Sequence, residues 1–275
     1  MVLMPLGEVD RWRLDEPDEA QIPPARDSAT VVLIRDGSGG PELYLMRRQA
    51  TMVFPGAYVF PGGLVDAADS EIDIAWVGES PEVWASRLGC DEATARGLVC
   101  AAVRETFEEA GILLAGPDEH SIVADVSGPE FIAARVALEN RELSFAAFLR
   151  DFNLVLRADL LAAWSHWVTP IIEPKRFDTR FFVARLPEGQ AVGELPGEAD
   201  RAAWTPLEEA IVASESRSIV MLPPTYQTCL SLRGIEPHEV LTAAAQRSIV
   251  PVLPRIVEVD GAYFLRMDLP EENDD

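Results

Sequence analysis

Several residue types are scarce in this chain, and each shortage excludes a class of protein. Lysine occurs only at Lys175, and 23 basic residues face 46 acidic ones, which gives a formal net charge of −23. A chain this acidic is a poor partner for nucleic acid or for an anionic membrane. It contains no run of about 18 apolar residues, so the sequence predicts no membrane-spanning helix.

Cysteine and histidine are rare as well. The three cysteines lack the spacing of a metal knuckle and indicate reduced, buried thiols, at Cys90, Cys100 and Cys229. The three histidines are scattered, which argues against a histidine-based metal site. The first residues do not form a charged-then-apolar leader, and residues 272–275 are not a peroxisomal address. We therefore expect a cytoplasmic protein.

A carboxylate-rich segment is the most informative feature present. Residues 104–112 read Arg-Glu-Thr-Phe-Glu-Glu-Ala-Gly-Ile and follow Phe-Pro-Gly-Gly at 60–63. A helix would place Glu105, Glu108 and Glu109 on one face, because they are three and four positions apart. A solvated helix face is one interpretation of the glutamates alone. Their context favours a hard divalent cation, since Mg²⁺ and Mn²⁺ take oxygen ligands.

This pattern resembles the signature of the Nudix hydrolases. In that family a Gly is followed after five residues by Glu, and after seven more by Arg-Glu-aliphatic-x-Glu-Glu-x-Gly-aliphatic. The segment from Arg104 to Ile112 matches the second half, except that Thr106 occupies an aliphatic position. Counting from Gly63 puts the first acidic position at Asp69. Here 34 residues, 70 to 103, stand where the family has seven, so 27 are additional.

The long box resembles the branch that includes the peroxisomal coenzyme A diphosphatases, and so do segments 56–63 and 175–182. Met52, however, stands where shorter-box coenzyme A diphosphatases carry Arg. The resemblance spans about residues 28 to 265. It implies an α/β fold, the Nudix-type α/β/α sandwich with a mixed sheet, a helical insertion inside the Nudix box and extra helices. We predict one domain over 1–275, with an N-terminal arm at 1–27, an insertion at 70–96 and a helical addition at 130–166.

Local patterns place the individual elements. Apolar strands and glycine-rich turns predict a hairpin over 30–46, a short strand at 58–60, a strand at 177–186 and a closing hairpin over 249–267 that turns at Asp260-Gly261. Capping residues and apolar spacing predict helices at 81–88, from Asp91 to Gly111, and at 205–214, 224–233 and 236–246. The insertion is expected to be a surface excursion that leaves the box geometry intact.

The resemblance implies a metal site with two or more Mg²⁺ or Mn²⁺ ions. Its ligands would be three box carboxylates and one backbone carbonyl, namely Glu105, Glu108, Glu109 and Gly62. Arg104 would orient a box glutamate through a salt bridge. The alternative for Arg104 is a simple i,i+4 pair with Glu108.

A general base is also required to deprotonate the attacking water. The family often takes it from a loop after the box, and here that loop is the acidic segment 193–200. Glu198 is the first choice and Glu194 the second, with a plain flexible loop as the alternative. If neither acts as the base, a box glutamate would, most readily Glu105.

Substrate recognition rests on the few basic side chains near these motifs. The candidates are Arg47, Arg48, Lys175, Arg176 and Arg180, of which the last three cluster in sequence. Arginine binds phosphate oxygens in a fork, which would suit the 3′-phosphate of coenzyme A. Ordinary pairing with surface carboxylates is the alternative.

The sequence thus predicts metal-dependent hydrolysis of the diphosphate bond in a nucleoside diphosphate derivative, with coenzyme A or acyl-coenzyme A as the first candidate. ADP-ribose, NADH or a nucleotide sugar is the alternative substrate. A Nudix-like ligand-sensing or interaction domain is the non-enzymatic alternative, although such domains typically lose box glutamates and this chain keeps all three. The expected partner is a small-molecule nucleotide. The oligomeric state is left open, with a homodimer as one option.

Overall fold

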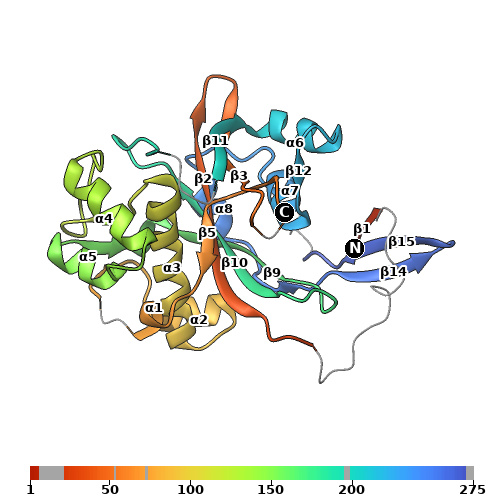
Figure 1. The fold of residues 1–275 in the computed structure, drawn as a ribbon, viewed down its shortest axis with the longest axis horizontal. Coiled ribbons are helices and arrows are strands. Elements are labelled where there is room, and N and C mark those ends of the chain that lie inside the picture. Colours follow the sequence, from red (N-terminus) through yellow and green to blue (C-terminus); the bar gives the residue numbers. More distant parts are fainter. Residues whose placement is uncertain (6–21, 53, 72–73, 195–198, 271–275) are drawn as a thin grey trace.

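The computed structural model describes residues 1–5, 22–52, 54–71, 74–194 and 199–270. Its largest sheet is mixed and runs in the order β12-β4-β3-β2-β10-β9-β13, with β5 joined to β2 and β11 joined to β3 (Figure 1). These strands are β2 (Arg26–Gly37), β3 (Gly40–Arg48), β4 (Ala57–Val59), β5 (Gly62–Leu64), β9 (Ala162–Val168), β10 (Phe177–Arg185), β11 (Ala199–Pro206), β12 (Val220–Met221) and β13 (Pro251–Val252).

The centre of this sheet is the parallel pair β2 and β10, which is buried on both faces. Their register runs from Phe177 opposite Arg26 to Arg185 opposite Ile34. Alternate residues of β2 enter different cores, because side chains on a strand point to opposite faces. Val31 packs in one hydrophobic cluster and Val32 in the other.

Helices cover both faces of the sheet, which confirms the predicted α/β/α sandwich. The first cluster packs against α1 (Ala67–Glu71), α2 (Pro81–Leu88), α3 (Glu92–Ala110), α4 (Pro129–Glu139) and α5 (Phe145–Asp151). The second packs against α6 (Leu207–Glu215), α7 (Pro223–Ser231) and α8 (Val240–Ala245). The three last helices lie close to their predicted positions, although α8 begins four residues later than expected.

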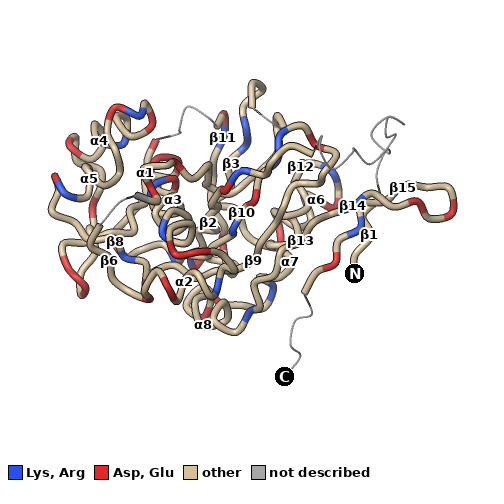
Figure 2. The backbone as a smooth tube through the Cα atoms, turned by 90° about the horizontal axis from the view of Figure 1, so that it is seen from below, with Lys and Arg blue, Asp and Glu red and all other residues tan. Residues whose placement is uncertain are grey.

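The box helix α3 begins and ends where the sequence predicts. The Asp91 side chain accepts a hydrogen bond from the Thr94 amide at 2.9 Å, which caps the first turn. Gly111 ends the helix in the left-handed region, at φ 69°. Figure 1 shows α3 lying against the sheet between α1 and α4, and Figure 2 shows acidic residues on many elements besides this helix.

The predicted helical addition at 130–166 is only partly correct. Helices α4 and α5 are present, but residues 155–168 contain β8 (Val155–Arg157), a 3₁₀ turn at Ala158–Leu160 and β9. Both faces of β9 are buried, with Ala163 in one core and Trp164 in the other. A strand buried on both faces lacks the polar alternation that distinguishes a strand from a helix in sequence.

The insertion keeps the box geometry but is more than a surface excursion. Helix α2 occupies its predicted residues, and its Trp84 and Leu88 are buried in the first core. The short strand β6 (Trp76–Val77) pairs with β8, which also pairs with β7 (Ala115–Gly116). The inserted residues therefore extend the core instead of lying outside it.

The two ends of the described chain meet in a separate small sheet. Strand β1 (Val2–Pro5) pairs with β15 (Ala262–Met267), which forms the predicted hairpin with β14 (Arg255–Val259). Asp260 and Gly261 turn this hairpin with φ 52° and 78°. The predicted arm at 1–27 therefore contains a strand at residues 2–5, and β2 already begins at Arg26. Residues 6–21 of the arm lie outside the described residues. Among the described residues, no helix is long and apolar enough to cross a membrane.

Candidate active site

Arg104 connects three carboxylates at the centre of the box. Its Nε and Nη2 donate to the two oxygens of Asp69 at 3.2 and 2.9 Å, and Nη1 donates to Glu105 at 2.7 Å and Glu108 at 3.2 Å. Nη2 also donates to the carbonyl of Leu64 at 2.9 Å. Asp69 is the acidic position reached by counting from Gly63, so the insertion has not displaced it. The i,i+4 pair with Glu108 is present as well, as one part of a larger network.

Burial makes these charges depend on one another. Arg104 is 6% exposed and Asp69 is 1% exposed. Burial alone would lower the pKa of Arg104, but the charges of Glu105 and Asp69 raise it above its ordinary value. Burial raises the pKa of Glu108, and the charge of Arg104 offsets only part of that increase. A further cation beside Glu108 would therefore favour its ionised form.

The Phe-Pro-Gly-Gly segment lies directly against the glutamates. The Gly62 amide donates to Glu109 Oε2 at 2.6 Å, and Glu109 is 7% exposed. A Cβ on Gly63 would lie 2.4 Å from Glu105 Oε1, and one on Gly62 would lie 2.4 Å from the Ala29 carbonyl. At position 62 only glycine leaves room for β5 to pair with β2, and at position 63 a side chain would displace the Glu105 carboxylate. Gly62 thus contacts Glu109 through its amide. Metal ligation by the Gly62 carbonyl stays a prediction.

The donor chemistry of this site fits a divalent cation. Glu105, Glu108 and Glu109 offer oxygen ligands from one helix face, beside a cradle that a Cβ at position 63 would fill. Within the described residues, no three acidic, histidine or cysteine side chains already converge as a metal cage. Glu105 and Glu108 instead accept from Arg104, and Glu109 accepts from the Gly62 amide. Metal binding would have to compete with these hydrogen bonds.

The acidic loop 193–200, predicted to supply the base, contacts the C-terminal end of the box helix through its first residue. The Gly193 amide donates to the Ala110 carbonyl at 2.9 Å, and Arg135 Nη2 donates to the Glu194 carbonyl at 3.0 Å. Glu194 is exposed. Glu198 lies outside the described residues.

Arg47 and Arg176, two of the five predicted substrate-binding side chains, already bind other groups of the protein. Arg47 forms a bidentate pair with Asp200, with both distances 2.7 Å. Arg176 donates to the carbonyls of Thr169 and Pro23 at 3.1 and 2.8 Å. Their guanidinium groups would have to leave these partners, at least in part, to bind phosphate.

Arg180 is the most constrained of the predicted phosphate ligands. It is 4% exposed, donates to Asp178 and lies 3.5 Å from Asp27. Lys175 is exposed. Arg48 is different again, because its buried Nε has no hydrogen-bond partner in the described structure. The five side chains are therefore not equivalent: Arg47 and Arg180 form ion pairs, and Arg176 donates to backbone carbonyls. For Arg48 and Lys175 the described residues show neither kind of partner.

Sequence reasoning missed two residues beside the site. Arg135 on α4 donates from Nε to the Glu108 carbonyl at 2.8 Å. In sequence it reads as an ordinary i,i+4 partner of Glu139, so no motif could have identified it. Tyr44 on β3 is 2% exposed; burial raises its pKa, the charge of Arg135 offsets part of that increase, and the charge of Glu109 adds to it. Its only sequence signal was membership of a predicted strand.

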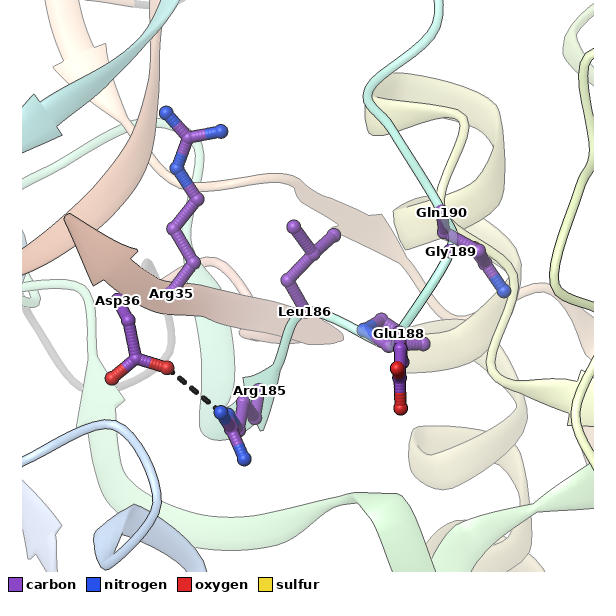
Figure 3. Close-up of a pocket in the computed structure, with 8 residues that line it drawn as sticks. Arg35, Asp36, Arg185, Leu186, Glu188, Gly189 and Gln190 are labelled. Atoms are coloured by element: carbon purple, nitrogen blue, oxygen red, sulfur yellow. Dashed lines mark hydrogen bonds and ion pairs between the residues drawn. The ribbon is translucent and has the colours of Figure 1, made fainter.

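One surface cavity lies apart from this site, at the ends of β2 and β10, and has a volume of about 340 Å³. Figure 3 shows Arg185 and Asp36 in it, which form an ion pair of 2.7 Å. None of its lining residues comes from the box.

Comparison with known proteins defines the class to which this fold and site belong. The family model of the NUDT19 Nudix domain matches residues 87–231, more than half of the chain. The chain therefore belongs to the Nudix hydrolases and, within them, to the NUDT19 Nudix domain family, as the box predicted. A crystal structure of a Nudix hydrolase from Alicyclobacillus acidocaldarius is 30% identical, covers 83% of this chain and 99% of that chain, and superposes with a TM-score of 0.64.

Curated relatives carry a more particular description. The acyl-coenzyme A diphosphatase NUDT19 of Gallus gallus is 30% identical in an alignment of 231 positions that covers 68% of this chain and 60% of that protein. The acyl-coenzyme A diphosphatase NUDT19 of Xenopus laevis is 28% identical in an alignment of 222 positions that covers 67% of this chain and 57% of that protein. The chain thus spans less than two thirds of the length of these relatives.

Proposed function

We propose that this chain hydrolyses the diphosphate bond of coenzyme A or acyl-coenzyme A with the help of a divalent metal ion. The observation that carries the proposal is the buried network in which Arg104 joins Asp69, Glu105 and Glu108 beside Gly62 and Gly63. The acyl-coenzyme A diphosphatase activity for which the curated relatives are named supports the choice of substrate.

In this proposal Glu105, Glu108 and Glu109 hold Mg²⁺ or Mn²⁺. The metal, when bound, would stabilise negative charge on the diphosphate and acidify a water molecule. Arg104 aligns Glu105 and Glu108 by hydrogen bonds and offsets part of the increase that burial causes in the pKa of Glu108, and the Gly62 amide orients Glu109. The base that takes the proton from the attacking water is assigned to Glu198 or Glu194.

Substrate recognition is assigned first to Arg48 and Lys175, with Arg47, Arg176 and Arg180 as further candidates. Arg48 and Lys175 have no carboxylate partner among the described residues, so a phosphate would not displace an ion pair. Desolvated Arg–phosphate contacts are stronger than exposed ion pairs.

A hydrolysis screen tests the proposal. The protein would be incubated with coenzyme A, acetyl-coenzyme A, ADP-ribose, NADH and dinucleoside polyphosphates, each with Mg²⁺, with Mn²⁺ or with EDTA. Metal-dependent release of a 4′-phosphopantetheine product is the expected result. Preferential hydrolysis of ADP-ribose or NADH would support the proposed diphosphatase activity but contradict the proposed substrate. Tight nucleotide binding without turnover would support the sensing alternative.

We predict that coenzyme A is hydrolysed with kcat/KM about 10-fold to 100-fold above that of dephospho-coenzyme A, because a charge-assisted phosphate contact is lost. Dephospho-coenzyme A is the matched control, since it lacks only the 3′-phosphate. If Arg48 and Lys175 bind this phosphate, Arg48→Gln and Lys175→Gln should narrow the ratio. Equal kcat/KM for the two substrates would contradict the assignment.

The remaining expectations concern the state of the protein in the cell. A small-molecule nucleotide is the proposed partner, and nucleic acid is not proposed, because the net charge is −23. Cytoplasmic location and a homodimer stay predictions. Light scattering of the purified protein would determine the oligomeric state.

A further inference from the structure

Arg135 lies between the end of the box helix and the loop that precedes β11. It comes from α4, outside the Nudix box, and its side chain is 11% exposed. Nε donates to the carbonyl of Glu108 at 2.8 Å, and Nη2 donates to the carbonyl of Glu194 at 3.0 Å. One guanidinium therefore holds the backbone of a proposed metal ligand and the backbone of a proposed base.

The C-terminus of a helix needs such partners. The last four carbonyls of a helix have no intrahelical donor. In α3 the Glu108 carbonyl is satisfied by Arg135, and the Ala110 carbonyl by the Gly193 amide. A positive charge at this end also interacts favourably with the helix dipole. Arg135 and Gly193 together complete the end of the box helix.

Close packing restricts where the loop can lie. A Cβ on Gly193 would be 2.5 Å from Arg135 Nη1, and a Cβ on Gly111 would be 2.9 Å from the Gly193 amide nitrogen. Gly111 also requires glycine for its φ of 69°. Two glycines thus allow the loop to touch the helix end, and Arg135 clamps it there.

We propose that Arg135 is a positioning residue, which anchors the backbone of the loop at Glu194 beside the proposed metal-binding turn of α3 and so limits how far the Glu194 carboxylate can move from it. This inference rests on the proposed function, and it takes Glu194 as the base. It also gives α4 a task in the reaction, although α4 lies outside the box. A base on an anchored backbone needs less ordering when the substrate binds, and a displacement of about 1 Å can cost up to about 100-fold in rate.

The kinetic test compares Arg135→Lys, which keeps the charge but loses the fork, with Arg135→Ala. Both should lower kcat about 10-fold to 100-fold while KM and the metal activation constant stay within about twofold. Arg150→Ala is the control, because Arg150 is 74% exposed on the adjacent helix α5. Unchanged kcat in both Arg135 variants, or parallel changes in kcat, KM and metal activation, would overturn the inference.

A double variant separates positioning from a general loss of structure. If Arg135 acts through Glu194, then Arg135→Lys combined with Glu194→Gln should be no slower than Glu194→Gln alone, within about twofold. Multiplicative losses would show that Arg135 acts elsewhere and would overturn the inference.

Hydrogen exchange tests the clamp without any turnover. In Arg135→Lys and in Gly193→Ala the Gly193 amide should exchange at least about tenfold faster, while amides in the middle of α3 keep their protection. Unchanged exchange at Gly193 in both variants would overturn the inference. Absence of turnover in the wild-type protein would instead count against the proposed function, and the exchange result would still decide whether Arg135 anchors the loop.

Discussion

Glu109→Gln should lower kcat for coenzyme A hydrolysis at least about 100-fold, because the variant loses a charged ligand that stabilises the transition state. Glutamine keeps an amide oxygen that can accept the 2.6 Å hydrogen bond from the Gly62 amide. The fold around residue 109 should therefore persist, and the loss of activity should report the missing charge. Steady-state kinetics over a range of Mg²⁺ concentrations would measure both kcat and the metal activation constant.

Glu92→Gln provides the matched control. Glu92 lies in the first turn of the same helix, is exposed and takes no part in the Arg104 network. The control should retain full activity. Near-normal turnover in Glu109→Gln would remove Glu109 from the metal site, and a decrease in Glu92→Gln of the same size would point to a general defect in α3.

The centre of the site could be predicted from sequence because it depends on local chemistry and counting. The spacing of Glu105, Glu108 and Glu109 fixes their common helix face, and the count from Gly63 identified Asp69 despite the insertion. The contacts of Arg104 with Asp69 and Glu105 agree with both expectations. Whether these residues bind metal and catalyse the reaction stays a prediction.

The periphery of the site could not be predicted, because it depends on tertiary contacts. Arg135 approaches Glu108 from a helix that begins 21 residues later in the chain, and nothing in the local sequence links the two. The same reason explains Arg180, a candidate phosphate ligand for which the sequence also allowed pairing with carboxylates. The parallel pairing of β10 with β2 brings it beside Asp27, and Asp178 lies two positions away on its own strand.

The fold was predictable where turn and capping residues mark the boundaries, as at Asp91, Gly111 and Asp260-Gly261. It failed at β9, because Ala163 and Trp164 are both buried, on opposite faces of the sheet. Burial of Trp84 in the insertion was missed for a similar reason. A short amphipathic helix does not reveal in its sequence whether another element covers its apolar side.

Arg104→Met should lower the free energy of unfolding by about 3–5 kcal/mol, since removing one partner leaves buried charges uncompensated. Methionine fills similar space without charge, so the loss of unfolding free energy should come from the carboxylates that no longer have a cationic partner. The unpaired carboxylate of Asp69 should contribute most to this loss, because Asp69 is 1% exposed. Urea denaturation at pH 7.5 would measure the change, and Arg150→Met, at an exposed position, should alter stability by less than about 0.5 kcal/mol.

Two further measurements identify the charges as the cause. Adding Asp69→Asn to Arg104→Met should restore part of the lost stability, because one uncompensated charge disappears.

The loss of unfolding free energy in Arg104→Met should also depend on pH. Burial already raises the pKa of Glu108, and Arg104 opposes that increase. Without Arg104 the folded-state pKa would rise further above the unfolded value, so stability is retained at low pH and lost as pH rises through the folded-state pKa. The deficit should therefore narrow as pH falls from 7.5 toward 5. A deficit below about 1 kcal/mol at pH 7.5, or one that does not change with pH, would mean that water or metal compensates these carboxylates in place of Arg104.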